Sequence, residues 1–125
     1  MKEFETYTLP NGIKGIHRRV KSSIAHCALV VNSGTRDELK TEYGLAHFTE
    51  HAIFKGTTHR KAYQVNCRLE NLGGELNAYT TKENTCFYSR SLDRHLDRSL
   101  DILSDMLFHS RFDNADTELE RGVIL

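Results

Sequence analysis

The run His47-Phe48-Thr49-Glu50-His51 places the strongest constraint on how this chain of 125 residues can fold. With about 100° between successive residues of a helix, His47, Glu50 and His51 point to the same side. The other positions of the segment are apolar, namely Leu45, Ala46, Phe48, Ala52 and Ile53. Because a helix that is apolar nearly all round is buried, the sequence predicts a buried helix that carries two imidazoles and a carboxylate.

Three polar side chains on a buried helix need partners, since each unpaired group would cost roughly 2 kcal/mol or more. A divalent metal ion with a bound water would satisfy all three. Phe54 falls near the same side of the helix, and we interpret it as a wall of the site. The HxxEH pattern also occurs by chance, and histidines four residues apart are often ordinary core or surface residues. The pattern is therefore a hypothesis that its surroundings must support.

Charge and cysteine content exclude several classes of protein. Lys plus Arg and Asp plus Glu number 17 each, and no run of one sign is long, so neither nucleic acid nor a membrane is an expected partner. Cys27, Cys67 and Cys86 form no CxxC pair, which favours free thiols in a reducing compartment. With no leader peptide and no run of 18 apolar residues, we expect a cytoplasmic protein.

The order of the expected elements indicates an α+β fold in one domain, with an antiparallel sheet and helices packed on one face. The final helix keeps an apolar stripe through Leu119, Val123 and Leu125, so we expect the chain to stop inside a helix. The expected elements are a hairpin over residues 4–20, a strand over 24–31, helices over 43–54 and 60–72, strands over 76–80 and 85–91, a helix over 93–109, and a last helix from about 113.

Four segments together carry a family resemblance: GLAHFTEH at 44–51, FKGT at 54–57, GGELNAYT at 73–80 and ERGVIL at 120–125. In this order and spacing they resemble the inverted-zincin peptidases, the family of pitrilysin, insulin-degrading enzyme and mitochondrial processing peptidase. The sequence is most similar to the processing peptidase branch and its bacterial relatives. Thr49 and Ala52 depart from that branch, in which larger apolar residues are more usual.

The resemblance implies a role for each matched residue. His47 and His51 would bind zinc, and Glu50 would act as the general base for a water that zinc activates. Asn77, Ala78 and Tyr79 would belong to an edge strand that binds an extended peptide substrate through its backbone. The implied activity is that of a zinc endopeptidase with one Zn²⁺ per catalytic domain.

The same resemblance places the third zinc ligand, a glutamate, at the second position beyond Leu125. Glu120 lies seven residues before that position, on the same helix face, and is expected to support the ligand. Glu120 could itself bind zinc only if the last turn unwound. Two histidines alone bind zinc weakly, so we expect the chain as given to be a poor or inactive peptidase.

In the family, residues 1–125 would form most of the first, catalytic domain, and a C-terminal half or a homologous subunit would complete the enzyme. Apolar surface left without these partners favours self-association. The alternatives are a non-catalytic accessory or structural subunit of the same fold and a simple metal-binding module, and the intact His47, Glu50 and His51 favour the peptidase. The remaining histidines are interpreted as ordinary residues: His17, His26, His59, His95 and His109.

Overall fold

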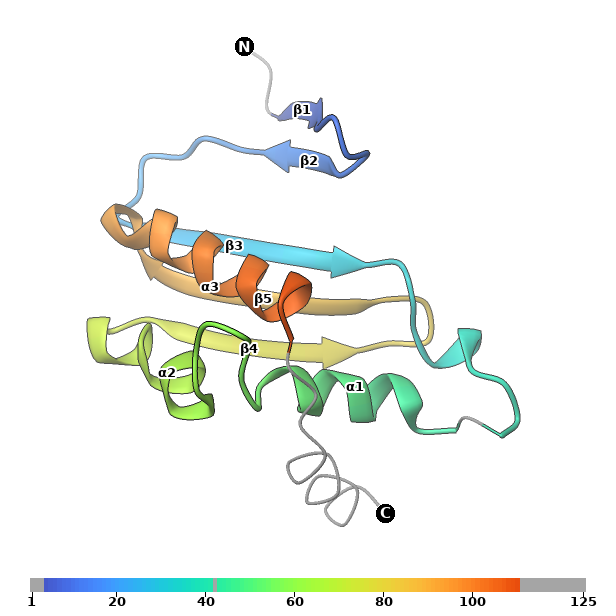
Figure 1. Cartoon of the computed structure of the whole chain (residues 1–125). Coiled ribbons are helices and arrows are strands. Elements are labelled where there is room, and N and C mark those ends of the chain that lie inside the picture. The colour runs from blue at the N-terminus through green and yellow to red at the C-terminus, as the bar shows by residue number, and fades with distance from the viewer. Residues whose placement is uncertain (1–3, 42, 111–125) are drawn as a thin grey trace.

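The computed structural model describes residues 4–41 and 43–110, which form two antiparallel sheets and three helices (Figure 1). The first sheet is a hairpin of β1 (Glu5–Thr8) and β2 (Lys14–His17). The second contains β3 (Ile24–Val31), β4 (Glu75–Thr80) and β5 (Thr85–Leu92) in the order β3-β5-β4. Because β5 lies in the middle, β4 is an edge strand of this sheet.

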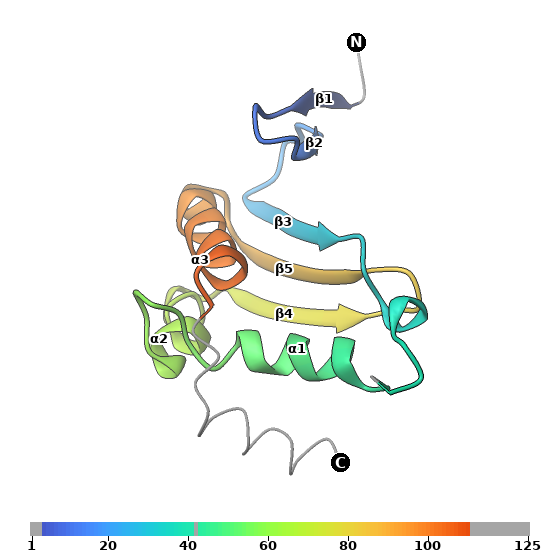
Figure 2. The same cartoon turned by 45° about the vertical axis from the view of Figure 1, so that its right-hand side comes forward.

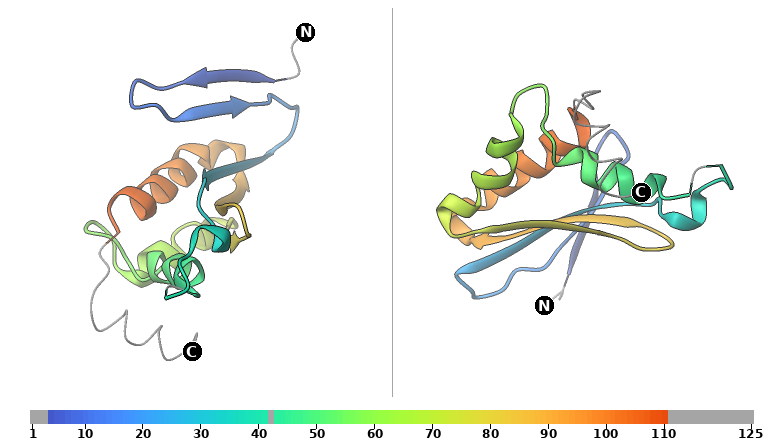
Figure 3. Two further views of the ribbon diagram at one scale, coloured as in Figure 1. Left: turned by 90° about the vertical axis from the view of Figure 1, so that its right-hand side faces the viewer. Right: turned by 90° about the horizontal axis from the view of Figure 1, so that it is seen from below.

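Three helices cover one face of the three-stranded sheet, as the view along the sheet shows (Figure 3). Helix α3 (Leu96–Phe108) lies over β3 and β5, and α1 (Leu45–Ile53) runs beside β4 (Figure 2). Helix α2 (Ala62–Cys67) follows α1. Short 3-10 turns precede or follow the helices: η1 (Thr35–Asp37), η2 (Glu70–Leu72) and η3 (Asp93–His95). The predicted α+β fold with helices on one face is confirmed.

The hydrophobic core lies between the middle strand and α3. Phe87 of β5 is almost fully buried and packs with Leu103 and Met106 of α3. Val65 and Leu69, from α2 and the residues after it, complete the same cluster and are fully buried. Of the leucines that predicted the long helix over 93–109, Leu103 is buried in this cluster and Leu107 packs against it, whereas Leu100 is 44% exposed.

The helix predicted over 60–72 is shorter in the structure, where α2 ends at Cys67 and η2 follows as a separate turn. Two glycines explain how the chain turns sharply here. Gly73 has a φ of 79°, which disfavours other residues. A Cβ on Gly74 would come within 2.7 Å of the Leu69 side chain. After α2 has ended at Cys67, Gly73 ends η2, and Gly74 allows the chain to pass close to Leu69 as it enters β4.

Helix α1 is less enclosed than its sequence predicts. Only Ala52 and Ile53 at its C-terminal end are buried, whereas Leu45 is 49% exposed. A helix that is apolar all round needs protein on every side, and within residues 4–41 and 43–110 the main neighbour of α1 is β4. The expectation of a fully buried helix is therefore corrected to a helix that is covered on one side.

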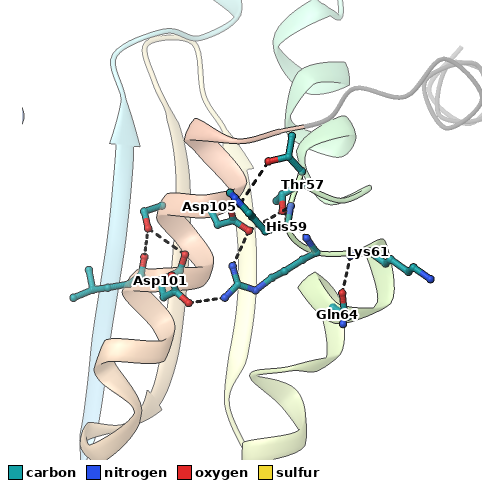
Figure 4. A network of polar contacts seen from close by, with 10 residues as sticks. Thr57, His59, Lys61, Gln64, Asp101 and Asp105 are labelled. Atoms are coloured by element: carbon teal, nitrogen blue, oxygen red, sulfur yellow. Dashed lines mark hydrogen bonds and ion pairs between the residues drawn. The ribbon is translucent and has the colours of Figure 1, made fainter.

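A network of polar contacts joins the loop after α1 to α3 (Figure 4). Asp105 of α3 is 5% exposed, and its Oδ2 accepts hydrogen bonds of 2.7 Å from the Thr57 hydroxyl and from Nη1 of Arg60. Its Oδ1 lies 2.8 Å from Nδ1 of His59. Arg60 also donates to the exposed Asp101. Asp105 thus fixes Thr57, His59 and Arg60 of this loop through charge-assisted hydrogen bonds, which set a direction that apolar contacts do not.

The protonation of Asp105 is coupled to folding. Burial opposes ionisation, but hydrogen bonds from Thr57, His59 and Arg60, together with the charge of Arg60, outweigh it and lower the pKa of Asp105 below its ordinary value of 3.8. A carboxyl whose pKa is lower in the folded state stabilises the fold above its ordinary pKa. That contribution is lost as the pH falls through the lowered value.

We predict that Asp105→Asn lowers the free energy of unfolding by about 3 kcal/mol at pH 7, because Arg60 loses a buried partner. The difference from the unchanged protein should narrow as the pH falls from about 4 through the lowered pKa of Asp105, below which the folded carboxyl is protonated as well. Urea denaturation at several pH values measures this. The control Asp101→Asn removes an exposed carboxylate from the same arginine and should cost less than about 1 kcal/mol. Equal losses at pH 7 and pH 3 would contradict the prediction.

None of the three helices in the described residues is long and apolar enough to cross a membrane. The predicted last helix and Glu120 lie outside the residues that the structure describes.

Candidate metal centre

The structure brings His47, Glu50 and His51 of α1 together, as the helical spacing predicts. Their possible ligand atoms all lie within 4.8 Å of one another. The Nε2 atoms of His47 and His51 are 2.9 Å apart, and their rings are perpendicular with centroids separated by 4.5 Å. Two zinc-bound nitrogens at about 2.1 Å from a tetrahedral ion lie roughly 3.4 Å apart, so a small rotation of the rings would admit the ion. The donor set therefore fits zinc.

Glu50 is held by the edge strand. The Thr80 hydroxyl, at the end of β4, donates a hydrogen bond to Glu50 Oε2. This contact ties the carboxylate to the sheet and leaves Oε1 as a further acceptor. The acid that would serve as a base is thus connected directly to the strand on which a peptide could lie.

The N-terminus of α1 is fixed by a carboxylate outside the helix. Glu38 accepts hydrogen bonds from the backbone N–H groups of Gly44, at 3.0 Å, and Ala46, at 2.8 Å. The first turn of a helix has N–H groups without partners in the helix and a partial positive charge, and an anionic acceptor stabilises both. Gly44 precedes the helix with a φ of 90°. Glu38 therefore sets where α1 begins, two residues before His47.

A hollow of about 340 Å³ lies between β4 and the side of α1 that carries Glu50 and His51. Glu50, His51 and Phe54 line it from one side, and Leu76 and Asn77 from the other. Asn66 donates to the Phe54 carbonyl at 3.2 Å and so holds the end of α1 in place. The interpretation of Phe54 as a wall of the site agrees with this position.

Asn77, Ala78 and Tyr79 lie on β4 and pair with Tyr88, Phe87 and Cys86 of β5. Their strand is at the edge of the sheet, as the prediction requires. The Asn77 side chain accepts a hydrogen bond of 2.8 Å from the Ala78 N–H. Any added strand that used this N–H would therefore have to displace the Asn77 amide oxygen.

Comparison with protein families gives a match to "Insulinase (Peptidase family M16)" over residues 16–125. This chain belongs to the M16 peptidase family. The match covers most of the chain and includes α1 with its three polar residues, so the family and the geometry of the site agree.

Relatives of this M16 chain include named peptidases and zinc proteases. It is 42% identical over 118 residues to the mitochondrial-processing peptidase subunit beta of Caenorhabditis elegans, covering 94% of this chain and 26% of that protein. It is 37% identical over 120 residues to the uncharacterized zinc protease YmxG of Bacillus subtilis, covering 94% of this chain and 29% of that protein. The chain thus spans somewhat over a quarter of the length of these relatives.

The fold matches that of a solved peptidase. The crystal structure of a protease from Helicobacter pylori superposes with a TM-score of 0.94 at 26% sequence identity, covering 98% of this chain and 30% of that one. A score this high at modest identity means that the arrangement of sheet and helices is shared throughout the compared region.

Sequence reasoning found the residues on α1 and missed those that hold them. Glu38 and Thr80 were not singled out, since a lone glutamate in a loop and a threonine at a strand end carry no local signal. Their roles depend on contacts between distant segments: Thr80 is thirty residues from Glu50 in sequence. Glu120 lies outside the described residues, so its predicted supporting role stays a prediction.

We predict that Glu38→Ala lowers the free energy of unfolding by about 1 kcal/mol, because two N–H groups of the first turn of α1 lose their acceptor. Urea denaturation followed by circular dichroism measures the change. Glu83→Ala is the matched control, since the Glu83 carboxylate is exposed and forms an ion pair with the exposed Arg36. Its effect should stay below about 0.5 kcal/mol. Similar losses in both variants would show that Glu38 does not anchor the helix.

Proposed function

We propose that the protein to which this chain belongs is a zinc endopeptidase that cleaves extended peptides. The observation that supports this most directly is the juxtaposition on α1 of two facing imidazoles and a carboxylate that Thr80 links to an edge strand. Membership of a peptidase family and likeness to relatives named as zinc proteases support the same activity.

In this proposal His47 and His51 hold the zinc ion through neutral imidazoles. When bound, zinc lowers the pKa of water and polarises the peptide carbonyl. Glu50 accepts the proton of the attacking water and returns it to the leaving amine. Thr80 keeps one carboxylate oxygen hydrogen-bonded, so that Glu50 stays beside the ligands rather than turning into solvent.

The substrate would lie along β4. Backbone groups of Asn77, Ala78 and Tyr79 would hydrogen-bond an extended peptide with little dependence on its sequence. The hollow between Phe54 and Asn77 is next to Glu50 and could receive one side chain of that peptide. Binding by backbone pairing explains why the site needs an extended rather than a folded substrate.

We further propose that the remaining parts of the enzyme come from a C-terminal half or from a homologous subunit. Support comes from apolar side chains that are exposed on the hairpin and on β3, including Ile16 at 68% and Val30 at 62%. An apolar hollow of about 570 Å³ also lies beside Leu29 and Ile53. Uncovered surface of this kind favours self-association of the isolated chain. A cytoplasmic location stays a prediction from the sequence.

An accessory subunit that keeps the fold without the activity is the second candidate. The relative from Caenorhabditis elegans is named as a subunit, which allows such a role for this protein. The complete set of His47, Glu50 and His51 favours catalysis, because a purely structural subunit has no need of a carboxylate held between two imidazoles and a strand.

The role of Glu50 can be tested in a version of the protein extended beyond Leu125. We predict that Glu50→Gln retains as much zinc as the unchanged extended protein, measured by elemental analysis, while cleavage of an unfolded peptide falls by at least about 100-fold. Glu70→Gln is the control, because Glu70 is exposed on η2, and it should leave cleavage unchanged. Full activity of Glu50→Gln would rule out Glu50 as the base.

The need for a third ligand gives a separate prediction for the isolated 125-residue chain. Zinc should bind to His47 and His51 at least about tenfold more weakly than in the extended version, since two imidazoles do not complete a catalytic zinc site. Titration of each protein, compared with its own His47→Ala/His51→Ala variant, isolates binding at this site. Equal affinities in the two lengths would show that the first 125 residues suffice.

A further inference from the structure

A second group of possible metal ligands lies at the other end of the loop that follows α1. His59, Asp105 and His109 place their ligand atoms within 4.8 Å of one another, and we call them the second cluster. His59 comes from the loop after α1, Asp105 from the last turns of α3, and His109 directly follows α3. The three are brought together only by folding, because His59 and Asp105 are 46 residues apart in sequence.

The carboxylate of the second cluster is already fixed in position. Thr57 and Arg60 both donate to Oδ2 of Asp105, so Oδ1 is directed toward His59 (Figure 4). Burial of Asp105 keeps water from competing for this oxygen. A donor held by its own hydrogen bonds needs little reorganisation before it binds a ligand.

The two imidazoles meet at the same place. The rings of His59 and His109 are nearly perpendicular, with centroids 4.9 Å apart. Nδ1 of His59 lies 2.8 Å from Asp105 Oδ1, a separation that would widen by a few tenths of an ångström around an ion with bonds of about 2.1 Å. Both histidines are exposed, with 62% of the His59 side chain accessible, so their rings can rotate.

The second cluster opens into a polar hollow of about 440 Å³. Its walls include all three candidate ligands, together with Arg60 and Ser104. An ion can therefore reach the cluster from solvent and keep water in its remaining coordination positions. This openness differs from a closed structural site, in which protein atoms supply every ligand.

We propose that His59, Asp105 and His109 form a second metal site, selective for imidazole-binding ions such as Zn²⁺, Ni²⁺ or Cu²⁺. Asp105 shares its charge with Arg60, so the cluster has little net negative charge to attract Mg²⁺ or Ca²⁺, which prefer oxygen ligands. Binding through Nδ1 of His59 places its ring proton on Nε2 and needs no oxidant or other reactant. A bound ion would join the loop after α1 to the end of α3. This inference does not depend on the proposed peptidase activity.

The experiment uses the 125-residue chain without an affinity tag and with His47→Ala and His51→Ala, which remove the first site and suit a helix. Calorimetric titration with ZnCl2 or NiCl2 should give one ion per chain. Adding His59→Ala or His109→Ala to this background should weaken binding at least about tenfold. Millimolar MgCl2 should not compete with the bound ion. If the double alanine variant does not fold, by circular dichroism, His47→Gln and His51→Gln replace it.

His26→Ala in the same background is the matched control, since His26 is exposed on β3, away from both clusters. It should leave the affinity unchanged. Three results would overturn the proposal. The first is no binding once His47 and His51 are replaced. The second is an affinity in the His59→Ala and His109→Ala variants as high as that of the background protein, and the third is a loss in the His26→Ala variant as large as in those two. Because the first site is absent from every protein compared, none of these results bears on the peptidase proposal.

Discussion

The position of α1 beside an edge strand is the constraint on which the site depends. Polar contacts hold it, among them Glu38 at the first turn, Thr80 at Glu50, Asn66 at the Phe54 carbonyl, and the bond between Thr57 and Asp105 beyond the last turn. Apolar packing alone would leave α1 free to slide or roll, because only its C-terminal end is buried. Directional hydrogen bonds to charged groups supply the orientation that nonspecific burial lacks.

Short-range sequence patterns were enough to predict most of the fold and the three polar residues of α1, but not the residues that hold them. The strand over 24–31 and the helix positions of His47, Glu50 and His51 follow from the local period of apolar and polar residues. The anchors could not be found in this way. Glu38, Thr80 and Asp105 act across gaps in sequence, and a threonine or an aspartate gives no sign of which distant partner it will meet.

The same limit explains the two expectations that the structure changed. An apolar period predicted a continuous helix over 60–72, whereas α2 ends at Cys67 and the separate turn η2 leads to Gly73 and Gly74. Apolar residues on nearly all sides of α1 predicted that the helix is buried. Burial depends on what packs against the helix, and here the sheet covers one side. His59 and His109, interpreted as ordinary residues, meet because Asp105 and a backbone hydrogen bond from Thr58 to the His109 carbonyl join their two segments.

The hydrogen bond from the Ala78 N–H to the Asn77 amide oxygen protects an edge strand that has no peptide paired with it. A bare strand at a sheet margin would recruit any stray polypeptide, including another molecule of its own kind, and so begin to aggregate. The Asn77 side chain occupies the Ala78 N–H and so makes this edge of the sheet less able to pair with other chains. A peptide displaces the Asn77 amide only if one of its carbonyl groups accepts the same hydrogen bond from the Ala78 N–H.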